Sequence, residues 1–142
     1  MKNFLKILIL LFLTSFIPHQ NLLANNPVPL GGDTLVWVFN CEIDNFANPF
    51  ALVANPGDFV KFKAISGEFS ILIRNASSFF ENVGYFLIIH IDSNGIKAPM
   101  ESNTFTVKSN LTADFEIKME VLCITSGGWA TAPPRIIIVP SD

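Results

Sequence analysis

Hydrophobic and polar residues alternate along much of the chain with a period of two. In the segment 59–65, Val60, Phe62 and Ala64 alternate with two lysines, and the segment 114–123 repeats this pattern over a longer run. Successive side chains of a β-strand point to opposite faces, so the pattern predicts half-buried strands. The same reasoning predicts eight strands in all, over residues 34–41, 50–54, 59–65, 68–74, 85–91, 104–108, 114–123 and 135–139.

Turn-forming residues separate the predicted strands. Asn55-Pro56-Gly57-Asp58 precedes one strand, Ser66-Gly67 divides two others, and Asp92-Ser93-Asn94-Gly95 follows a fourth. No segment has a convincing helical period. Short strands divided by turns are typical of a sandwich or a barrel, so we expect an all-β fold of about seven to eight strands.

The segment 85–91 differs from the others because it is apolar on both faces. Its sequence, YFLIIHI, interrupts the apolar run only with the aromatic Tyr85 and with His90. Strands without a polar face are typically covered on both sides. We therefore predict a central strand here.

The N-terminal residues have the features of an export signal. Lys2 and Lys6 precede an apolar run over residues 7–17, and Ala24 is a small residue suited to cleavage. The alternative is a membrane anchor, but the run is shorter than the roughly 20 residues that span a bilayer. We expect a signal peptide over residues 1–24, an extended lead-in over 25–32, and one domain over 33–142. The localisation would then be secreted, periplasmic or cell-surface, with no membrane insertion after cleavage.

Charge argues against two classes of partner. The chain has a formal net charge of −3, and removing Lys2 and Lys6 with the signal peptide lowers it to about −5. The remaining cations are scattered along the sequence rather than clustered. Nucleic acid and anionic membrane surfaces both attract clustered cations, so neither is an expected partner.

Two cysteines, Cys41 and Cys123, follow the predicted signal peptide. An even pair in an exported chain favours one disulfide, whereas two buried free thiols are the alternative. Cys41 shares a strand face with Trp37 and Phe39, and Cys123 shares one with Val121. If both faces point inward, the two sulfurs meet across the core.

A family resemblance adds to this pattern. The stretch Pro56-Gly57-Asp58-Phe59-Val60-Lys61-Phe62 resembles the opening of a cupredoxin strand, and Cys123 lies before the last loop, where blue-copper proteins place a thiolate ligand. The ending, from Ala132 to Pro140, resembles that of small secreted bacterial proteins with cupredoxin-like domains. The resemblance implies a Greek-key β-sandwich with cupredoxin-like strand order; an immunoglobulin-like sandwich is the alternative.

The copper ligands of that family have no full counterpart in this sequence. A blue-copper site needs two histidines, a cysteine and usually a methionine, yet residues 124–134 contain neither histidine nor methionine. His90 is the single histidine after the predicted signal peptide. We expect no cofactor; if copper binds after all, His90 and Cys123 would hold it, with Met100 or Met119 as a third ligand.

Other candidate sites are weaker. The segment Asp92–Gly95 has the oxygen-rich start of a calcium loop but lacks its later acids, so a turn is favoured. No catalytic triad, carboxylate pair or phosphate-binding loop is visible, and we expect no enzyme activity. Three aromatic residues in loops, Phe79, Phe80 and Trp129, would either anchor a partner or fold back over one end of the sandwich.

These features lead to one functional expectation. The chain is predicted to be a secreted, non-catalytic β-sandwich that acts as a binding or structural module for an unknown protein or glycan partner. A copper-binding or electron-transfer protein with a degenerate site is the alternative. An enzyme with an unrecognised site is a third reading.

Overall fold

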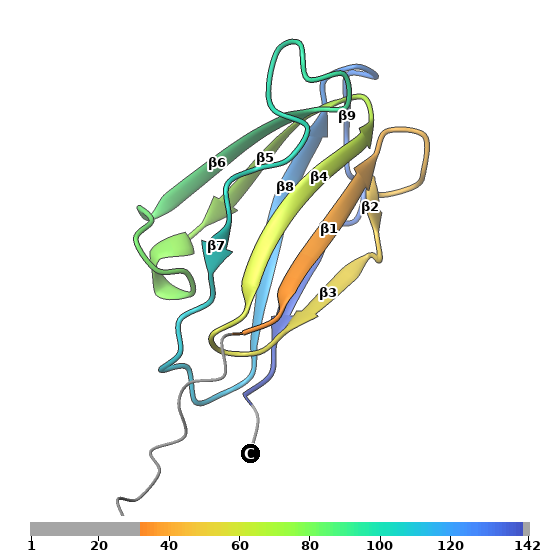
Figure 1. Cartoon of the computed structure of the whole chain (residues 1–142). Helices are drawn as coiled ribbons and strands as arrows, with labels where there is room; N and C mark the ends of the chain where they lie inside the picture. Colours follow the sequence, from red (N-terminus) through yellow and green to blue (C-terminus); the bar gives the residue numbers. More distant parts are fainter. Residues whose placement is uncertain (1–31, 141–142) are drawn as a thin grey trace, which may run out of the picture. The chain divides into compact units, whose positions relative to one another are not determined.

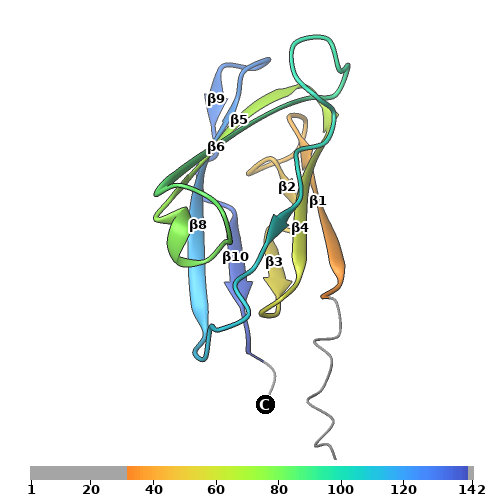
Figure 2. The same cartoon turned by 60° about the vertical axis from the view of Figure 1, so that its left-hand side comes forward.

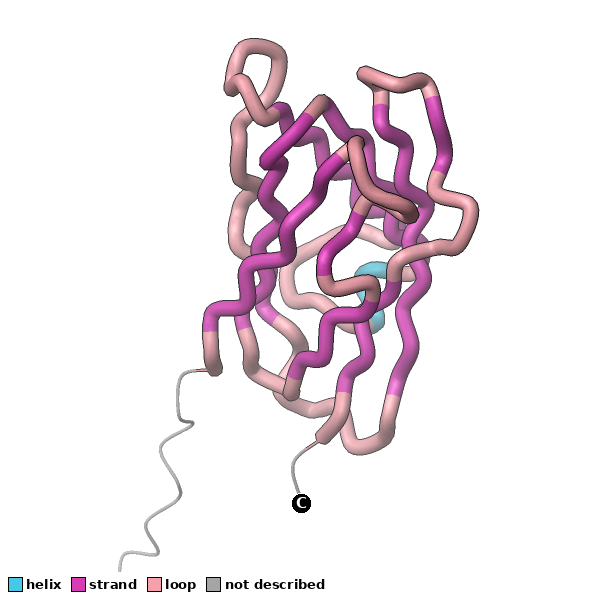
Figure 3. Tube along the Cα trace, turned by 90° about the vertical axis from the view of Figure 1, so that its right-hand side faces the viewer, coloured by secondary structure: helices cyan, strands magenta, loops and turns pink. Residues whose placement is uncertain are grey.

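Two mixed β-sheets pack face to face in the structure, a computed structural model that describes residues 32–140 (Figure 1). The strands are β1 (Thr34–Asn40), β2 (Ala47–Asn48), β3 (Ala51–Ala54), β4 (Phe59–Ser66), β5 (Glu68–Arg74), β6 (Phe86–Asp92), β7 (Phe105–Thr106), β8 (Phe115–Cys123), β9 (Gly128–Trp129) and β10 (Arg135–Ile138). One short 3₁₀ turn, η1 (Ala76–Ser78), follows β5 and is the only helical segment drawn in Figure 3. The all-β sandwich predicted from the sequence is confirmed.

The chain passes several times from one sheet to the other. The first sheet has the order β2-β1-β4-β7, and the second has the order β3-β10-β8-β5-β6, with β9 paired to β8. Most pairs are antiparallel, but β1 pairs with β4 in parallel, and so does β3 with β10. Figure 2 views the two layers from the side, with β6 and β8 in one layer and β1 and β4 in the other. All eight predicted segments form strands, and the two-residue strands β2 and β9 are additional.

Strand β6 is not the central strand that its apolar sequence predicts. It lies at the end of the second sheet and pairs only with β5. Ile89 and Ile91 face the core, whereas Phe86 and Ile88 face outward and are exposed. The prediction is wrong because an apolar outward face does not require a covering layer within the same chain.

Aromatic rings join the two sheets at the centre of the core. Trp37 and Phe39 of β1 and Phe62 of β4 come from the first sheet, and Phe69 of β5 comes from the second; all four are fully buried. The Phe39 ring lies 5.4 Å from Trp37, 6.0 Å from Phe62 and 5.7 Å from Phe69 between centroids. Such spacing is typical of favourable aromatic pairs, so these rings are a principal contact between the layers.

Asp58 explains why the turn before β4 has its particular sequence. Its buried carboxylate accepts hydrogen bonds from the backbone N–H groups of Asp33, at 3.0 Å, and Asn55, at 2.7 Å. Gly57 adopts a φ of 92°, which favours glycine. The turn thereby ties the end of β3 to the starts of β1 and β4.

A disulfide between Cys41 and Cys123 links the sheets at the opposite end of β1. The two residues are 82 positions apart in sequence, and their Cα atoms lie 5.8 Å apart. Gly67, in the turn between β4 and β5, has a φ of 86°, and a Cβ there would collide with the Cys41 sulfur. The disulfide predicted from the strand faces is confirmed, and Gly67 is needed to make room for it.

The predicted signal peptide and nearly all of the predicted lead-in lie outside the described residues. Within residues 32–140, no helix is long and apolar enough to cross a membrane.

Candidate binding surface

The outer face of the second sheet carries a row of side chains across four strands. His90 of β6 lies opposite Ser70 of β5, Ser70 lies opposite Leu122 of β8, and Leu122 lies opposite Trp129 of β9. Each of these residues alternates with neighbours that face the core. The short strand β9 exists because the loop after Cys123 turns back along β8, and this places the Trp129 side chain on the sheet surface.

Large apolar side chains gather on the part of this face formed by β6, β5 and β9, whereas Glu116, Lys118 and Arg135 occupy the part formed by β8 and β10. A second row contains Ile88 of β6, Leu72 of β5 and Glu120 of β8. Trp129 and Ile88 are each 60% exposed, Phe86 is 58% exposed and Tyr85 is 57% exposed. Scattered exposed apolar residues are ordinary on protein surfaces, whereas several on one sheet face indicate a contact surface. We call the set Leu72, Phe86, Ile88, Leu122 and Trp129 the outer apolar face.

One ion pair crosses the outer apolar face. The Arg74 Nε atom donates to Glu120 Oε1 at 2.7 Å. This hydrogen bond and the opposite charge lower the pKa of Glu120 and raise the pKa of Arg74. An exposed pair adds little stability, but it leaves this part of the face without net charge. A partner would therefore meet apolar and neutral polar groups here.

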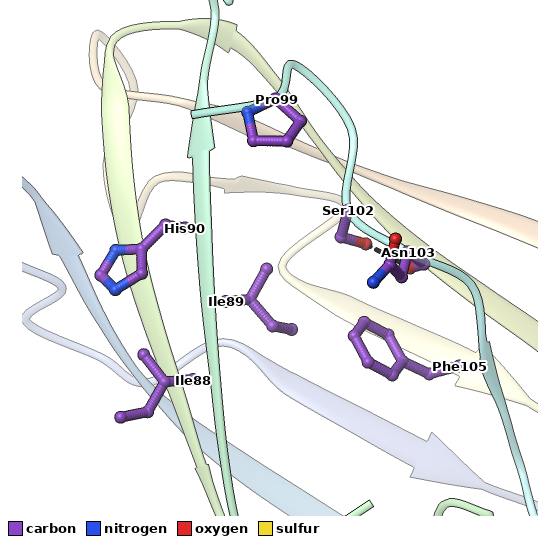
Figure 4. Close-up of a pocket in the computed structure, with 7 residues that line it drawn as sticks. All are labelled: Ile88, Ile89, His90, Pro99, Ser102, Asn103 and Phe105. Carbon is purple, nitrogen blue, oxygen red and sulfur yellow. Dashed lines mark hydrogen bonds between the residues drawn. The ribbon is translucent and has the colours of Figure 1, made fainter. Parts of the chain in front are cut away.

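A small hollow lies beside β6, between the two sheets (Figure 4). Ile89 points into it from β6, and Phe105 faces it from β7, whereas His90 and Ile88 point to the other side of the strand. Ser102 lies at the rim, where its hydroxyl donates to the Asn103 carbonyl at 2.6 Å. The hollow holds about 160 Å³, which is well below the roughly 300 Å³ at which ligand pockets begin. It is too small for a drug-sized ligand.

The three loop aromatics take different places. Phe80 is only 1% exposed, and its ring lies 6.1 Å from that of Phe105, so of the two alternatives it folds back over the sandwich. Phe79 is half-buried against the core, with its ring 5.5 Å from Phe115. Both fold back over the sandwich because the chain after η1 pairs with the segment following β7. Trp129 alone stays exposed.

Sequence reasoning missed Tyr85, Phe86 and Ile88 as surface residues. Their signal is the two-sided apolar pattern of 85–91, which on its own predicts burial. The edge position of β6 depends on how the strands pair across the sheet, and a local sequence pattern does not indicate these pairings.

The two candidate copper ligands are not brought together. His90 lies opposite Ser70 and Cys123 opposite Phe69, which are adjacent residues of β5, so the two side chains leave the sheet on opposite faces. Cys123 is buried and bonded to Cys41, and a sulfur in a disulfide has no thiolate to offer a metal. Met119 is buried in the core and Met100 is exposed. Within residues 32–140, no group of three or more His, Cys, Asp or Glu side chains is arranged to hold a metal ion.

The segment after β6 is a turn organised by Asp92. Its buried carboxylate accepts hydrogen bonds from the backbone N–H groups of Asn94, at 3.1 Å, Lys97, at 3.1 Å, and Ile96, at 3.3 Å. These bonds lower the pKa of Asp92, the bond from Asn94 most of all. The carboxylate oxygens therefore serve the turn, as the non-calcium interpretation of this sequence expected.

The lowered pKa of Asp92 predicts a loss of stability in acid. The stabilisation is complete at pH values above the pKa of an aspartate in the unfolded chain, about 3.9. It is lost as the pH falls through the lower pKa that Asp92 has in the folded state. An Asp92→Asn variant should unfold more easily at pH 7 and should lose less further stability between pH 5 and 2 than the wild type. Urea unfolding across this range measures the difference, with Asp114→Asn, at an exposed carboxylate, as the control. If the free energy of unfolding fell equally between pH 5 and 2 in the wild type and in Asp92→Asn, this role of Asp92 would be contradicted.

The geometry defines a disulfide-linked β-sandwich with one apolar outer face. No family model matches the chain, and no curated protein matches it in sequence. The function is therefore argued from the surface itself.

Proposed function

We propose that this chain is an exported, non-catalytic β-sandwich module that binds a protein or glycan partner through its outer apolar face. The observation that carries the proposal is Trp129, whose indole is 60% exposed in register with Leu122, Ser70 and His90. Tryptophan is enriched among the residues that dominate binding energy, because it combines a large apolar area with a polar N–H. The Arg74–Glu120 pair on the same face of the sheet favours a partner surface without strong net charge.

We further propose that the domain is cupredoxin-like rather than immunoglobulin-like. Immunoglobulin-type sandwiches are built from antiparallel sheets. Here each sheet contains a parallel pair, β1 with β4 and β3 with β10, which favours the cupredoxin-like alternative. The turn that carries the Pro-Gly-Asp resemblance also has a structural role, because Asp58 holds the starts of two strands together.

The disulfide supports export. Disulfides form and persist in oxidising compartments and are rare in the cytosol. Together with the sequence features of residues 1–24, it favours secretion or placement in the periplasm or at the cell surface.

Replacement of Trp129 tests the binding proposal. A glycan array and an array of secreted or envelope proteins from the source would identify the partner, and titration would give its affinity. Trp129→Ala is expected to weaken that binding at least about tenfold, because an exposed indole at the contact would be lost. The chain has two tryptophans and Trp37 is fully buried, so acrylamide quenching of wild-type fluorescence reports whether a bound partner covers Trp129.

Ile96→Ala is the control, since Ile96 is exposed in the Asp92 turn and lies outside the outer apolar face. Unchanged affinity in Trp129→Ala would contradict the assignment of the surface. Sustained turnover of a substrate by the purified protein would contradict a non-catalytic module.

A further inference from the structure

Four strands end the two sheets in the described part of the chain, apart from the two-residue β9, and β6 is the longest of them and is bonded to another segment only at its Asp92 end. The edges are β2 and β7 in the first sheet and β3 and β6 in the second. Strands β2 and β7 have two residues each, and β3 has four. The far side of β7 is partly occupied, because the Glu81 N–H donates to the Thr106 carbonyl at 2.9 Å. Strand β6, with seven residues, is the long edge.

The backbone of β6 has hydrogen-bonding groups directed at this open edge. The Asp92 N–H donates to the Pro99 carbonyl at 3.0 Å, on the side away from β5. Backbone groups alternate between the two sides of a strand, so the N–H and C=O groups of His90, Ile88 and Phe86 point the same way. Beyond Pro99 the chain leaves β6 and crosses to the first sheet, where Phe105 pairs with Val60. The small hollow of Figure 4 lies between β6 and this segment, where the segment diverges from β6.

The sequence of this edge lacks the usual protection against pairing. Natural edge strands are commonly protected by lysines, prolines, bulges or a covering segment. No charged residue and no proline occurs between Tyr85 and Ile91. The outward side chains of Phe86 and Ile88 are exposed and apolar, and the pairing of β6 with β5 runs without a bulge.

We infer that β6 pairs antiparallel with β6 of a second copy of this chain, about a twofold axis at Ile88. The inference rests on the proposed function of a binding or structural module and names one partner for it. In this register Ile88 lies opposite Ile88 of the other copy, and Phe86 lies opposite His90. The outward backbone groups of these three residues then bond across the axis, and the second sheets of the two copies become continuous.

Charge favours a second copy as the occupant. A twofold axis brings identical residues together, so a charged strand would repel itself. Here the uncharged run Tyr85–Ile91 faces itself, and Asp92 falls opposite Gly84 rather than opposite another acid. The arrangement is isologous, as in most symmetric dimers.

The contact area sets the strength of this dimer. Tyr85, Phe86 and Ile88 are each close to 60% exposed, which amounts to at most roughly 400 Å² of side-chain surface per copy. A stable complex buries about 800 Å² per partner. The dimer should therefore be weak, reversible and dependent on concentration.

Sedimentation velocity on the purified, oxidised protein from about 1 μM to 1 mM tests the inference. The wild type should move from monomer to dimer over this range. Ile88→Lys and Ile88→Glu should each raise the dimer dissociation constant at least about tenfold, because like charges would face each other at the axis. Mixing the two variants should restore a dimer, because opposite charges then meet. Val53→Lys, at the exposed edge β3, should leave the wild-type dimer intact.

Several results would overturn the pairing. These are a monomer at every concentration, a dimer that survives both Ile88 substitutions, and a mixture of the two variants that stays monomeric. A monomer that binds a foreign strand or glycan through Trp129 overturns the pairing alone and leaves the proposed function standing. Loss of the proposed function would instead appear as unchanged partner binding in Trp129→Ala.

Discussion

Removal of the Cys41–Cys123 disulfide is expected to lower the free energy of unfolding by about 4 kcal/mol. The bond closes a loop of 82 positions, and loop-closure entropy in the unfolded chain gives a value of this size. The free energy of unfolding of a native protein is only about 5–15 kcal/mol in total, so the loss is a large fraction of the stability. The link also cross-links the two sheets at the ends of β1 and β8. Urea unfolding of the oxidised and reduced protein measures the difference.

The double variant Cys41→Ala/Cys123→Ala provides the control for this prediction. Its free energy of unfolding should equal that of the reduced wild type within about 1 kcal/mol, and a reducing agent should not change it. A reduced wild type that unfolds at the same urea concentration as the oxidised form would contradict the stabilising role of the bond.

Phe39→Ala is expected to cost about 3–5 kcal/mol, the range found when a buried aromatic is truncated. Its ring is fully buried and contacts three other rings, Trp37 and Phe62 in its own sheet and Phe69 in the facing sheet. Loss of the ring leaves a cavity between the layers that backbone hydrogen bonds prevent from closing. Thermal or urea unfolding measures the loss, and the emission of Trp37 reports the change in its surroundings.

Phe86→Ala makes the same chemical change on the outer apolar face. Phe86 is mostly exposed, so its truncation should change stability by no more than about 0.5 kcal/mol in dilute protein. If both variants lost the same stability, the account of which face is core and which is surface would be contradicted.

The sequence predicts most of the fold because alternation is a local property. Val60, Phe62 and Ala64 are all fully buried, as their period of two indicates. The same parity places Cys41 and Cys123 on inward faces and leads to the observed disulfide. Short strands such as β2 and β9 leave no such signal, since two residues cannot display a period.

The candidate surface was harder to predict because exposure depends on distant pairings. The apolar run of β6 fits a strand covered by its own chain and equally a strand covered by a partner. Phe80 illustrates the reverse case: its loop sequence is compatible with exposure and with burial, and a pairing with Val107 carries it into the core. Asp58 was visible as a turn residue, but its bond to the backbone of Asp33 spans 25 positions and could not be anticipated.

The proposals share one requirement, that Cys123 is a structural half-cystine and not a copper ligand. Native mass spectrometry of the protein, purified without reducing agent and then offered copper, tests this requirement directly. The account predicts a mass two hydrogens below that of the reduced chain, with no copper retained. A full-mass thiol form carrying one copper ion would contradict it and would make His90 and Cys123 the first residues to replace.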